Sequence, residues 1–361
     1  MEIKLFAFAA LMAASVLTAC GGTGKSVAGY GAQHEWYDDD NGETEKTLGL
    51  RNFNGIKSSM CVDVRYTQGS GYKVVARGTS RALSFADISV EDGLIYVRWK
   101  DSFSGTYRTG VDERITLFVT APKFEKFESN GSKTFTTGTY KVDELDIDNK
   151  GGFDLKCGDI IGKSAGAKAT ISSGGRITIT AGRISLGGLD VASSGALELS
   201  NEGLTAHDVK FSNYGRMTYS GDVKAGNVVI ESSGASDITA GFDVSGNYTF
   251  KNSGGMTFNG NISAKNVDID NYGACDISSE VKADMMDCSN GGRCNGSVSF
   301  TGGTLNLDCS GAGDFDVRLD CREVKAQAYG RLHLTLSGTA DNVDLSGSGV
   351  SEINTSGLNK F

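Results

Sequence analysis

A glycine-centred unit recurs about every twenty residues from Phe127 to the C-terminus, and no other feature constrains the fold as strongly. In residues 211–219 and 269–277 the same order repeats: apolar, polar, Asn, any residue, Gly, any residue, apolar, polar, apolar. The central glycines of the twelve units are Gly131, Gly151, Gly175, Gly195, Gly215, Gly234, Gly254, Gly273, Gly292, Gly313, Gly330 and Gly349. A fixed period of this length is the signature of a repeat architecture.

Each position of the unit forms a column with its own chemistry. The residue four before the glycine is apolar or cysteine in every unit, from Phe127 to Leu345, and the residue three after it is always polar. Alternation of apolar and polar residues over four or five positions is the period of a β-strand. The glycine lies between two such strands, where we expect the chain to turn through backbone angles that side chains resist.

These columns predict an all-β fold, a single-stranded parallel β-helix of about twelve ~20-residue coils. One coil alone has no core, but stacked coils bury their inward residues against each other. At ~4.8 Å per coil the repeat predicts a rod on the order of 55 Å long. Ser or Asn side chains two residues before the glycine are expected to hydrogen-bond from coil to coil. The competing fold, a glycine-rich β-sandwich, does not predict a twenty-residue period.

The N-terminus reads as an export signal. An apolar run follows Lys4, and it is too short for a membrane-spanning helix, which needs roughly 20 residues. Leu17-Thr18-Ala19-Cys20-Gly21 resembles the lipobox of bacterial lipoproteins. We therefore expect residues 1–19 to be a lipoprotein signal peptide and Cys20 to be the lipid attachment site. Several acyl chains on one residue give stable membrane anchoring.

The segment 20–46 is expected to be a flexible, acidic linker. Its acidic cluster lies at residues 38–43 and lacks the ligand spacing of a calcium loop. Gly21 after the lipidated cysteine favours the outer membrane, and either of its faces is compatible with the sequence. The net charge of −9 argues against nucleic acid as a partner.

Residues 47–122 lack the glycine period but keep strand alternation, and we expect an N-terminal β cap with the first irregular coils, followed by β-helix repeats over 123–361. Phe53-Asn54-Gly55-Ile56, Asp92-Gly93-Leu94-Ile95 and Ile115-Thr116-Leu117 up to Ala121-Pro122 stand in an order that resembles the head GIN domain of the auto-transporter adhesins, common in Bacteroidota. The resemblance runs from about Leu48 to the C-terminus. It implies a right-handed parallel β-helix on the cell envelope and brings no known activity.

Cysteine pairing stays open in the sequence. Cys275 and Cys294 occupy one inward column in adjacent coils, and Cys288 and Cys309 are assigned to another. Their α-carbons are expected ~4.8 Å apart, within the disulfide range, but parallel β-carbons favour free thiols over disulfides. No Cys-x-x-Cys motif is present, and inward ladders do not converge tetrahedrally, so no zinc site is expected.

The outward column three residues after the glycine carries the weak candidates for a binding or catalytic site: Asp154, Asp237, Asp276 and Asp316, among threonines. Paired acids on such a face cleave glycans in some β-helices, but a solvated strand face has the same composition. The aromatic residues Tyr214, Tyr272 and Tyr329 are expected at the turn instead of on this face. No nucleophile is placed beside His34, His207 or His333.

Two function classes follow. The favoured one is a binding, adhesion or structural rod on the envelope that meets a glycan or protein ligand, with no cofactor and no catalytic residues. The alternative is an envelope polysaccharide lyase or glycoside hydrolase acting along the acidic column.

Overall fold

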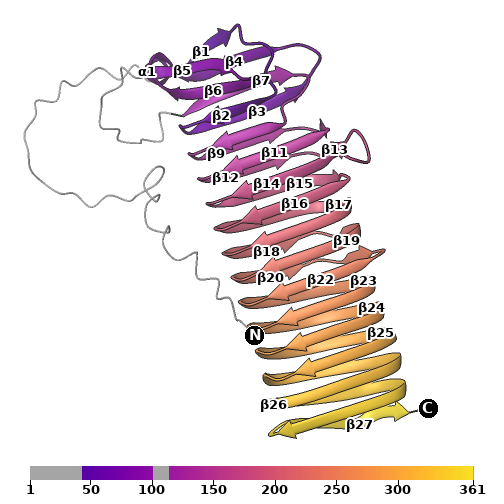
Figure 1. The fold of residues 1–361 in the computed structure, drawn as a ribbon. Helices are drawn as coiled ribbons and strands as arrows, with labels where there is room; N and C mark the ends of the chain where they lie inside the picture. Colours follow the sequence, from indigo (N-terminus) through magenta and orange to yellow (C-terminus); the bar gives the residue numbers. More distant parts are fainter. Residues whose placement is uncertain (1–42, 101–113, 361) are drawn as a thin grey trace, which may run out of the picture.

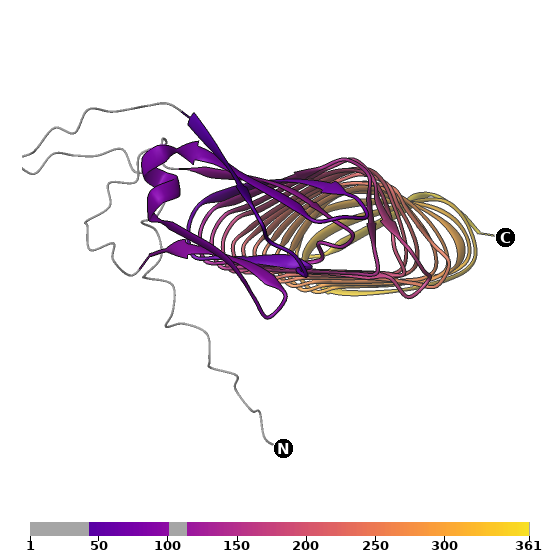
Figure 2. The same ribbon diagram turned by 90° about the horizontal axis from the view of Figure 1, so that it is seen from above.

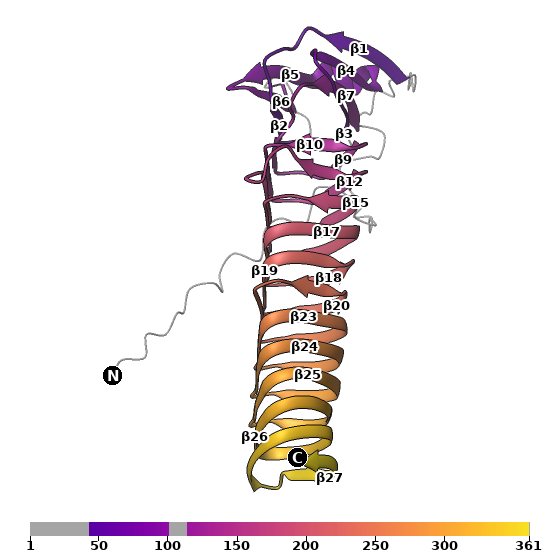
Figure 3. The same ribbon diagram turned by 90° about the vertical axis from the view of Figure 1, so that its right-hand side faces the viewer.

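The glycine units stack as the coils of one long parallel β-solenoid, as the sequence predicts (Figure 1). This computed structural model describes residues 43–100 and 114–360. Within them the single helix is α1 (Ser80–Phe85), and all other regular structure is β-strand. Seen from the side, the coils form a rod with the N-terminal strands over one end (Figure 3).

The strands of the N-terminal end are β1 (Glu43–Leu48), β2 (Gly55–Ser58), β3 (Val62–Gln68), β4 (Lys73–Thr79), β5 (Ala86–Glu91), β6 (Leu94–Trp99) and β7 (Ile115–Ala121). The first coils of the repeat contain β8 (Lys126–Ser129), β9 (Lys133–Thr137), β10 (Tyr140–Val142), β11 (Glu144–Asn149), β12 (Phe153–Cys157), β13 (Ile160–Gly162), β14 (Lys168–Ser173), β15 (Ile177–Ser185) and β16 (Gly188–Ser193). Further along the rod the strands merge across corners into β17 (Ala196–Asn213), β18 (Arg216–Ser220), β19 (Val223–Ser232), β20 (Ala235–Thr239), β21 (Phe242–Val244), β22 (Asn247–Asn252), β23 (Gly255–Asn271), β24 (Ala274–Asn290), β25 (Arg293–Cys309), β26 (Ala312–Gly349) and β27 (Glu352–Lys360).

The N-terminal end departs from simple stacking. The coil formed by β2 and β3 pairs in parallel with β8 and β9 below it and with β6 and β7 above it. The chain therefore makes the outermost coil, β6 and β7, before it returns to start the repeat. On the outer side, β4 pairs antiparallel with β7 and with β1, and β5 pairs antiparallel with β6. These strands lie across the end of the rod (Figure 2), where they occupy strand edges that would otherwise invite other chains.

The inward columns form one continuous core. Ile230 lies between Phe211 and Phe250 of the neighbouring coils, in direct register with both, and all three side chains are buried. Near the cap the core is aromatic, with the rings of Phe127 and Phe135 4.5 Å apart. Burying a large apolar side chain stabilises the fold by roughly 1.5–3 kcal/mol, and stacking repeats that contribution in every coil.

The central glycines are required by close contact between backbones. A β-carbon on Gly234 would lie 1.7 Å from the carbonyl oxygen of Gly215, and one on Gly273 would lie 1.8 Å from that of Gly254. The expectation that unusual backbone angles explain this column is wrong for these glycines, because the positive φ values of the described residues lie elsewhere, with Gly330 as the exception in the column. Adjacent turns pack so tightly that no side chain fits.

The pairing register of β25 and β26 corrects one position in the column of central glycines. Gly292 is followed in the column by Gly311, not Gly313, because Arg293 pairs with Ala312. The true spacing from Gly254 onward is a constant 19 residues. Cys309 therefore lies opposite Asn290, and Cys288 lies opposite Leu307, so these two cysteines do not share a column. Cys275 and Cys294 do share one.

The ladder that the sequence predicts two residues before the glycine forms at Asn252, Asn271 and Asn290, whereas Asn213 and Ser232 make their side-chain hydrogen bonds within their own coil. The side-chain amide of Asn252 donates to the side-chain oxygen of Asn271 over 2.8 Å, and Asn271 donates to Asn290 over 2.7 Å. Each of these asparagines also donates to the backbone oxygen of the glycine two residues later. The ladder thus satisfies buried polar groups at the tightest turn of the coil.

Candidate binding surfaces along the rod

The expected lipid attachment site at Cys20, the signal peptide and most of the acidic linker lie outside the described residues. In the part of the chain that is described, no helix has the length and apolar character needed to cross a bilayer.

The acidic column is a flat and regular surface. Asp237 pairs in register with Thr257, which pairs with Asp276, so a threonine separates these two aspartates. Next in the column come Asn295, whose amide donates to Asp276 over 3.2 Å, and Asp314, whose backbone N–H donates to Asn295. An acid therefore occupies every second coil in the series Asp63, Asp154, Glu198, Asp237, Asp276, Asp314 and Glu352.

This alternation has a structural reason. Carboxylates on adjacent parallel strands would lie ~4.8 Å apart and repel each other, and a neutral residue between them doubles that separation. Asp154, Asp237 and Asp276 are thus evenly spread and belong to neither groove described below. The sequence assigned Asp316 to this column, and that assignment is wrong, because Asp316 pairs with Ser297 and Asp314 takes its place.

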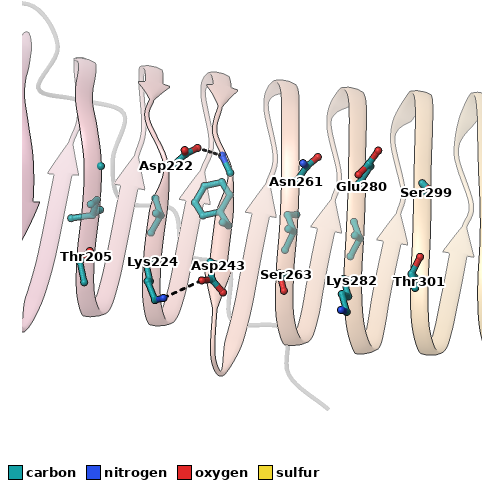
Figure 4. Close-up of a pocket in the computed structure, with 17 residues that line it drawn as sticks. Thr205, Asp222, Lys224, Asp243, Asn261, Ser263, Glu280, Lys282, Ser299 and Thr301 are labelled. Carbon is teal, nitrogen blue, oxygen red and sulfur yellow. Dashed lines mark hydrogen bonds and ion pairs between the residues drawn. The ribbon is translucent and has the colours of Figure 1, made fainter.

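Two shallow grooves run over other parts of the rod. The first, about 700 Å³, crosses six coils and is drawn in Figure 4. Its walls carry both signs of charge: Lys224 and Asp243 form an ion pair at 3.5 Å, and Lys282 lies further along. Asp222 accepts a hydrogen bond from the backbone of Gly241 over 3.0 Å. The second groove includes Asp316 and Arg318. Neither groove presents an exposed aromatic ring.

Exposed aromatic rings gather on the edge formed by the glycine turns. Tyr214 and Tyr272 are each 71% exposed and Tyr329 is 39% exposed. Each stands one residue before a central glycine, with two coils between successive tyrosines. Three coils at ~4.8 Å place the rings about 14 Å apart along the rod. The intervening residues are small and exposed: Ser233, Ser253, Gly291 and Ser310.

Arginines accompany the tyrosines and were not predicted from the sequence. They stand one residue after a central glycine, at Arg176, Arg216, Arg293 and Arg331, and all four are exposed. Arg176 pairs with Glu198 at 3.5 Å, whereas the other three form no ion pair with any described residue. Alignment of the position after each glycine would have revealed this column. We call Tyr214, Tyr272, Tyr329, Arg216, Arg293 and Arg331 the tyrosine–arginine edge.

Each of the two described histidines lies beside one acidic side chain. His207 lies on the surface with its Nδ1 atom 2.9 Å from Asp208, and Nδ1 of His333 lies 3.4 Å from Glu352. His34 is outside the described residues. Among the residues that are placed, no group of three or more His, Cys, Asp or Glu side chains has the arrangement of a metal site.

An all-β rod with outward columns and one exposed aromatic edge defines the class of this molecule as an elongated parallel β-solenoid. More narrowly, the chain belongs to the family described as "Putative auto-transporter adhesin, head GIN domain", whose model matches residues 52–219 and 282–360. The resemblance found in the sequence is thereby confirmed. A search of curated proteins finds no match.

Solved structures of similar proteins come from Bacteroides and Parabacteroides species. A "putative adhesin" from Parabacteroides merdae ATCC 43184 is 12% identical with a TM-score of 0.33, and the match covers 87% of this chain and 96% of that one. A "putative lipid binding protein" from Parabacteroides distasonis ATCC 8503 is 12% identical with a TM-score of 0.32, over 89% and 98%. A "putative adhesin" from Bacteroides fragilis NCTC 9343 is 13% identical with a TM-score of 0.26, over 87% and 96%.

Proposed function

We propose that this protein is a lipid-anchored rod of the bacterial outer membrane that binds an extended acidic glycan along the tyrosine–arginine edge. The observation that carries the proposal is the regular placement of exposed tyrosines, three coils apart, with unpaired arginines beside them. Membership in an adhesin-like family supports a binding role. The lipobox at Cys20 supports the anchor, and the acidic linker serves as a tether between anchor and rod.

The edge suits a linear polymer because its contact groups recur in a straight line along the rod. A tyrosine offers a flat apolar face for a sugar ring and a hydroxyl group for hydrogen bonding. A guanidinium group pairs with a carboxylate or sulfate through two parallel hydrogen bonds. Small residues between Tyr214 and Tyr272, such as Ser233 and Ser253, leave the polymer room to pass.

The charges favour an acidic ligand on this edge over the acidic column and over the ion-paired part of the first groove. The chain as a whole carries a net charge of −9, and the acidic column would repel an anionic polymer. In the first groove, Lys224 is already paired with Asp243, which leaves less positive charge for an outside ligand. Arg216, Arg293 and Arg331 form no ion pair with a residue that the structure describes, so their guanidinium groups are available to a glycan carboxylate.

The test compares an acidic and a neutral glycan of the same length. Polygalacturonate is expected to bind the full-length protein with an affinity that falls as salt rises, and a neutral glucan is expected to bind weakly. Arg216→Ala and Tyr272→Ala should each weaken binding about tenfold. Ser253→Ala on the same edge and Thr257→Ala on the acidic face are the matched controls. Equal binding by the edge variants and the controls would contradict glycan binding along the tyrosine–arginine edge.

The same samples decide between binding and catalysis. We expect no new reducing ends or unsaturated products after long incubation with acidic, neutral or mucin glycans, with or without calcium. Asp237 and Asp276 lie two coils apart, on the order of 10 Å, which is the upper end of the separation for an inverting pair of acids. Turnover that disappears in Asp237→Asn or Asp276→Asn would replace the binding role with an enzymatic one.

A further inference from the structure

Two cysteine side chains meet inside the rod. Cys275 of β24 and Cys294 of β25 are paired in register, and both point into the core, where they are 5% and 6% exposed. The column continues with Met256 on one side of the pair, while Gly313, which has no side chain, lies on the other. The two cysteines therefore occupy the same inward column of the core in two adjacent coils.

The sulfur atoms are closer than two unbonded thiols can comfortably lie. Sγ of Cys275 is 2.6 Å from Sγ of Cys294. A disulfide bond is about 2.05 Å long, and it needs α-carbons about 4.4–6.8 Å apart, a range that includes the ~4.8 Å spacing of parallel strands. The expectation that parallel β-carbons keep the sulfurs apart does not hold at this position, because the two side chains turn toward each other. Only a small rotation separates the contact from a covalent bond.

We propose that Cys275 and Cys294 form a disulfide bond that joins two adjacent coils when the chain folds in an oxidising compartment. The oxidant is a disulfide of the general form R–S–S–R, such as oxidised glutathione or a protein disulfide. One cysteine thiolate attacks R–S–S–R and expels RS⁻, and the second cysteine then attacks the mixed disulfide and expels the other RS⁻. The two thiol protons end on two RSH molecules, so R–S–S–R is reduced as the cysteine pair is oxidised.

No other pair of free cysteines among the described residues is aligned in this way. Cys288 lies opposite Leu307 and Cys309 lies opposite Asn290, so each has a different kind of neighbour in the next coil. Cys157 and Cys321 lie in distant coils. The cross-link is therefore specific to Cys275 and Cys294, and it is independent of the tyrosine–arginine edge.

Burial of the two thiols in the folded core determines at which stage of folding the disulfide bond can form. The hydrogen bond with Cys275 and desolvation both raise the pKa of the Cys294 thiol, so little thiolate exists once the coils are packed. The core also excludes the oxidant from the sulfurs. We expect oxidation to accompany folding, and we expect the folded, reduced chain to react slowly.

Mass spectrometry tests the bond directly. The full chain is reduced in urea, refolded with oxidised and reduced glutathione, quenched with N-ethylmaleimide and digested. Because trypsin leaves Cys294 and Cys309 together on residues 294–318, a second cleavage before Asp308 is needed to separate them. The expected product links the peptide of Cys275 to that of Cys294, with Cys288 and Cys309 alkylated. Oxidised glutathione added to the folded, reduced chain should give the same product at least tenfold more slowly.

Two variants test whether the link to Cys275 is made by Cys294. Cys294→Ser should abolish the linked peptide and leave Cys275 alkylated, whereas Cys309→Ser should leave the link intact. Urea unfolding gives a second measurement, because reduction should lower the midpoint of the wild type and leave that of Cys294→Ser unchanged. Full alkylation of both cysteines after oxidative refolding would overturn the proposal, and so would a link from Cys275 to any other cysteine.

Discussion

The carbonyl oxygen of Gly215 lies 1.7 Å from the position that a β-carbon on Gly234 would take. Since the contact is with backbone of the next coil, no side-chain rotation can relieve it. Gly234→Ala should therefore force two coils apart and lower the free energy of unfolding by about 3 kcal/mol. The measurement is urea unfolding followed by circular dichroism.

Gly255 provides the control for this substitution. It lies in the next coil, yet a β-carbon there would have no atom within 4 Å. Gly255→Ala should leave stability within about 0.5 kcal/mol of the wild type. If both alanine variants unfold at the same urea concentration, close backbone contact is not the reason for the glycine column.

The assignment of inward and outward columns predicts opposite effects for the same new side chain. Ile230→Asp places a carboxylate between Phe211 and Phe250, where burial either neutralises the acid or breaks the coil. We expect a loss of about 4 kcal/mol or more. Thr257→Asp lies on the exposed face between two other acids, so its effect should be a small, salt-sensitive destabilisation. Similar unfolding midpoints for the two variants would contradict the columns.

Lys133 is a charged residue in an otherwise apolar inward column. Its side chain is 3% exposed, lies in register with Val62 and Phe153, and donates to the backbone oxygen of Glu128 over 3.0 Å. Burial lowers its pKa to about 7 in the folded chain. In the unfolded chain the pKa of Lys133 has its ordinary value of about 10.4. Between pH 7 and about pH 10, Lys133 is therefore protonated in the unfolded chain and mostly neutral in the folded chain. The unfolding free energy contributed by this group therefore rises from pH 7 to about pH 10.

Lys133→Met removes the ionisable group and keeps a long, flexible side chain. The variant should be more stable than the wild type at pH 7, by a few kcal/mol at most, and the difference should shrink as the pH rises toward 10. Urea unfolding at pH 7, 8.5 and 10 measures this. A stability difference that stays constant over that range would mean that Lys133 remains charged in the fold.

Cys20→Ser tests the proposed anchor. Without the thiol no lipid can be attached, so the variant should move from the membrane fraction to the soluble fraction or accumulate unprocessed. Fractionation after a carbonate wash, with Cys157→Ser as a control that keeps the lipobox, measures the change. Equal membrane association of wild type and Cys20→Ser would contradict a lipid anchor, and protease treatment of intact cells would identify the exposed membrane face.

The sequence predicts the solenoid well because stacking repeats the same environment in every coil. Ile230 and the asparagine ladder could be placed by counting from a glycine, since their chemistry depends only on the column. Counting failed at Gly311 and Gly313, because the sequence pattern does not decide which of the two glycines packs against Gly292. The wrong choice of Gly313 also placed Cys309 and Asp316 in the wrong columns. The contact of the two cysteine sulfurs depends on rotamers, which a pattern does not contain.

The tyrosine–arginine edge was likewise predicted only in part from the sequence. The tyrosines were expected at the turn, and the structure adds their exposure and their common edge. The arginines were missed because the position after the glycine is arginine in some coils and a small residue in others, such as Arg216 and Ala235, and so has no uniform chemistry. Their importance depends on the absence of acidic partners among residues 43–100 and 114–360, which is a property of the folded surface.

The most direct test of the binding edge is the dependence of affinity on ligand length. Galacturonate oligomers of increasing length are titrated into the full-length protein by calorimetry at low salt. Affinity should rise steeply once an oligomer spans the roughly 14 Å from Tyr214 to Tyr272, and rise again when it reaches Tyr329 at about twice that distance. In Tyr272→Ala the first rise should disappear. An affinity that is independent of length, or a length dependence unchanged by Tyr272→Ala, would contradict an extended glycan along this edge.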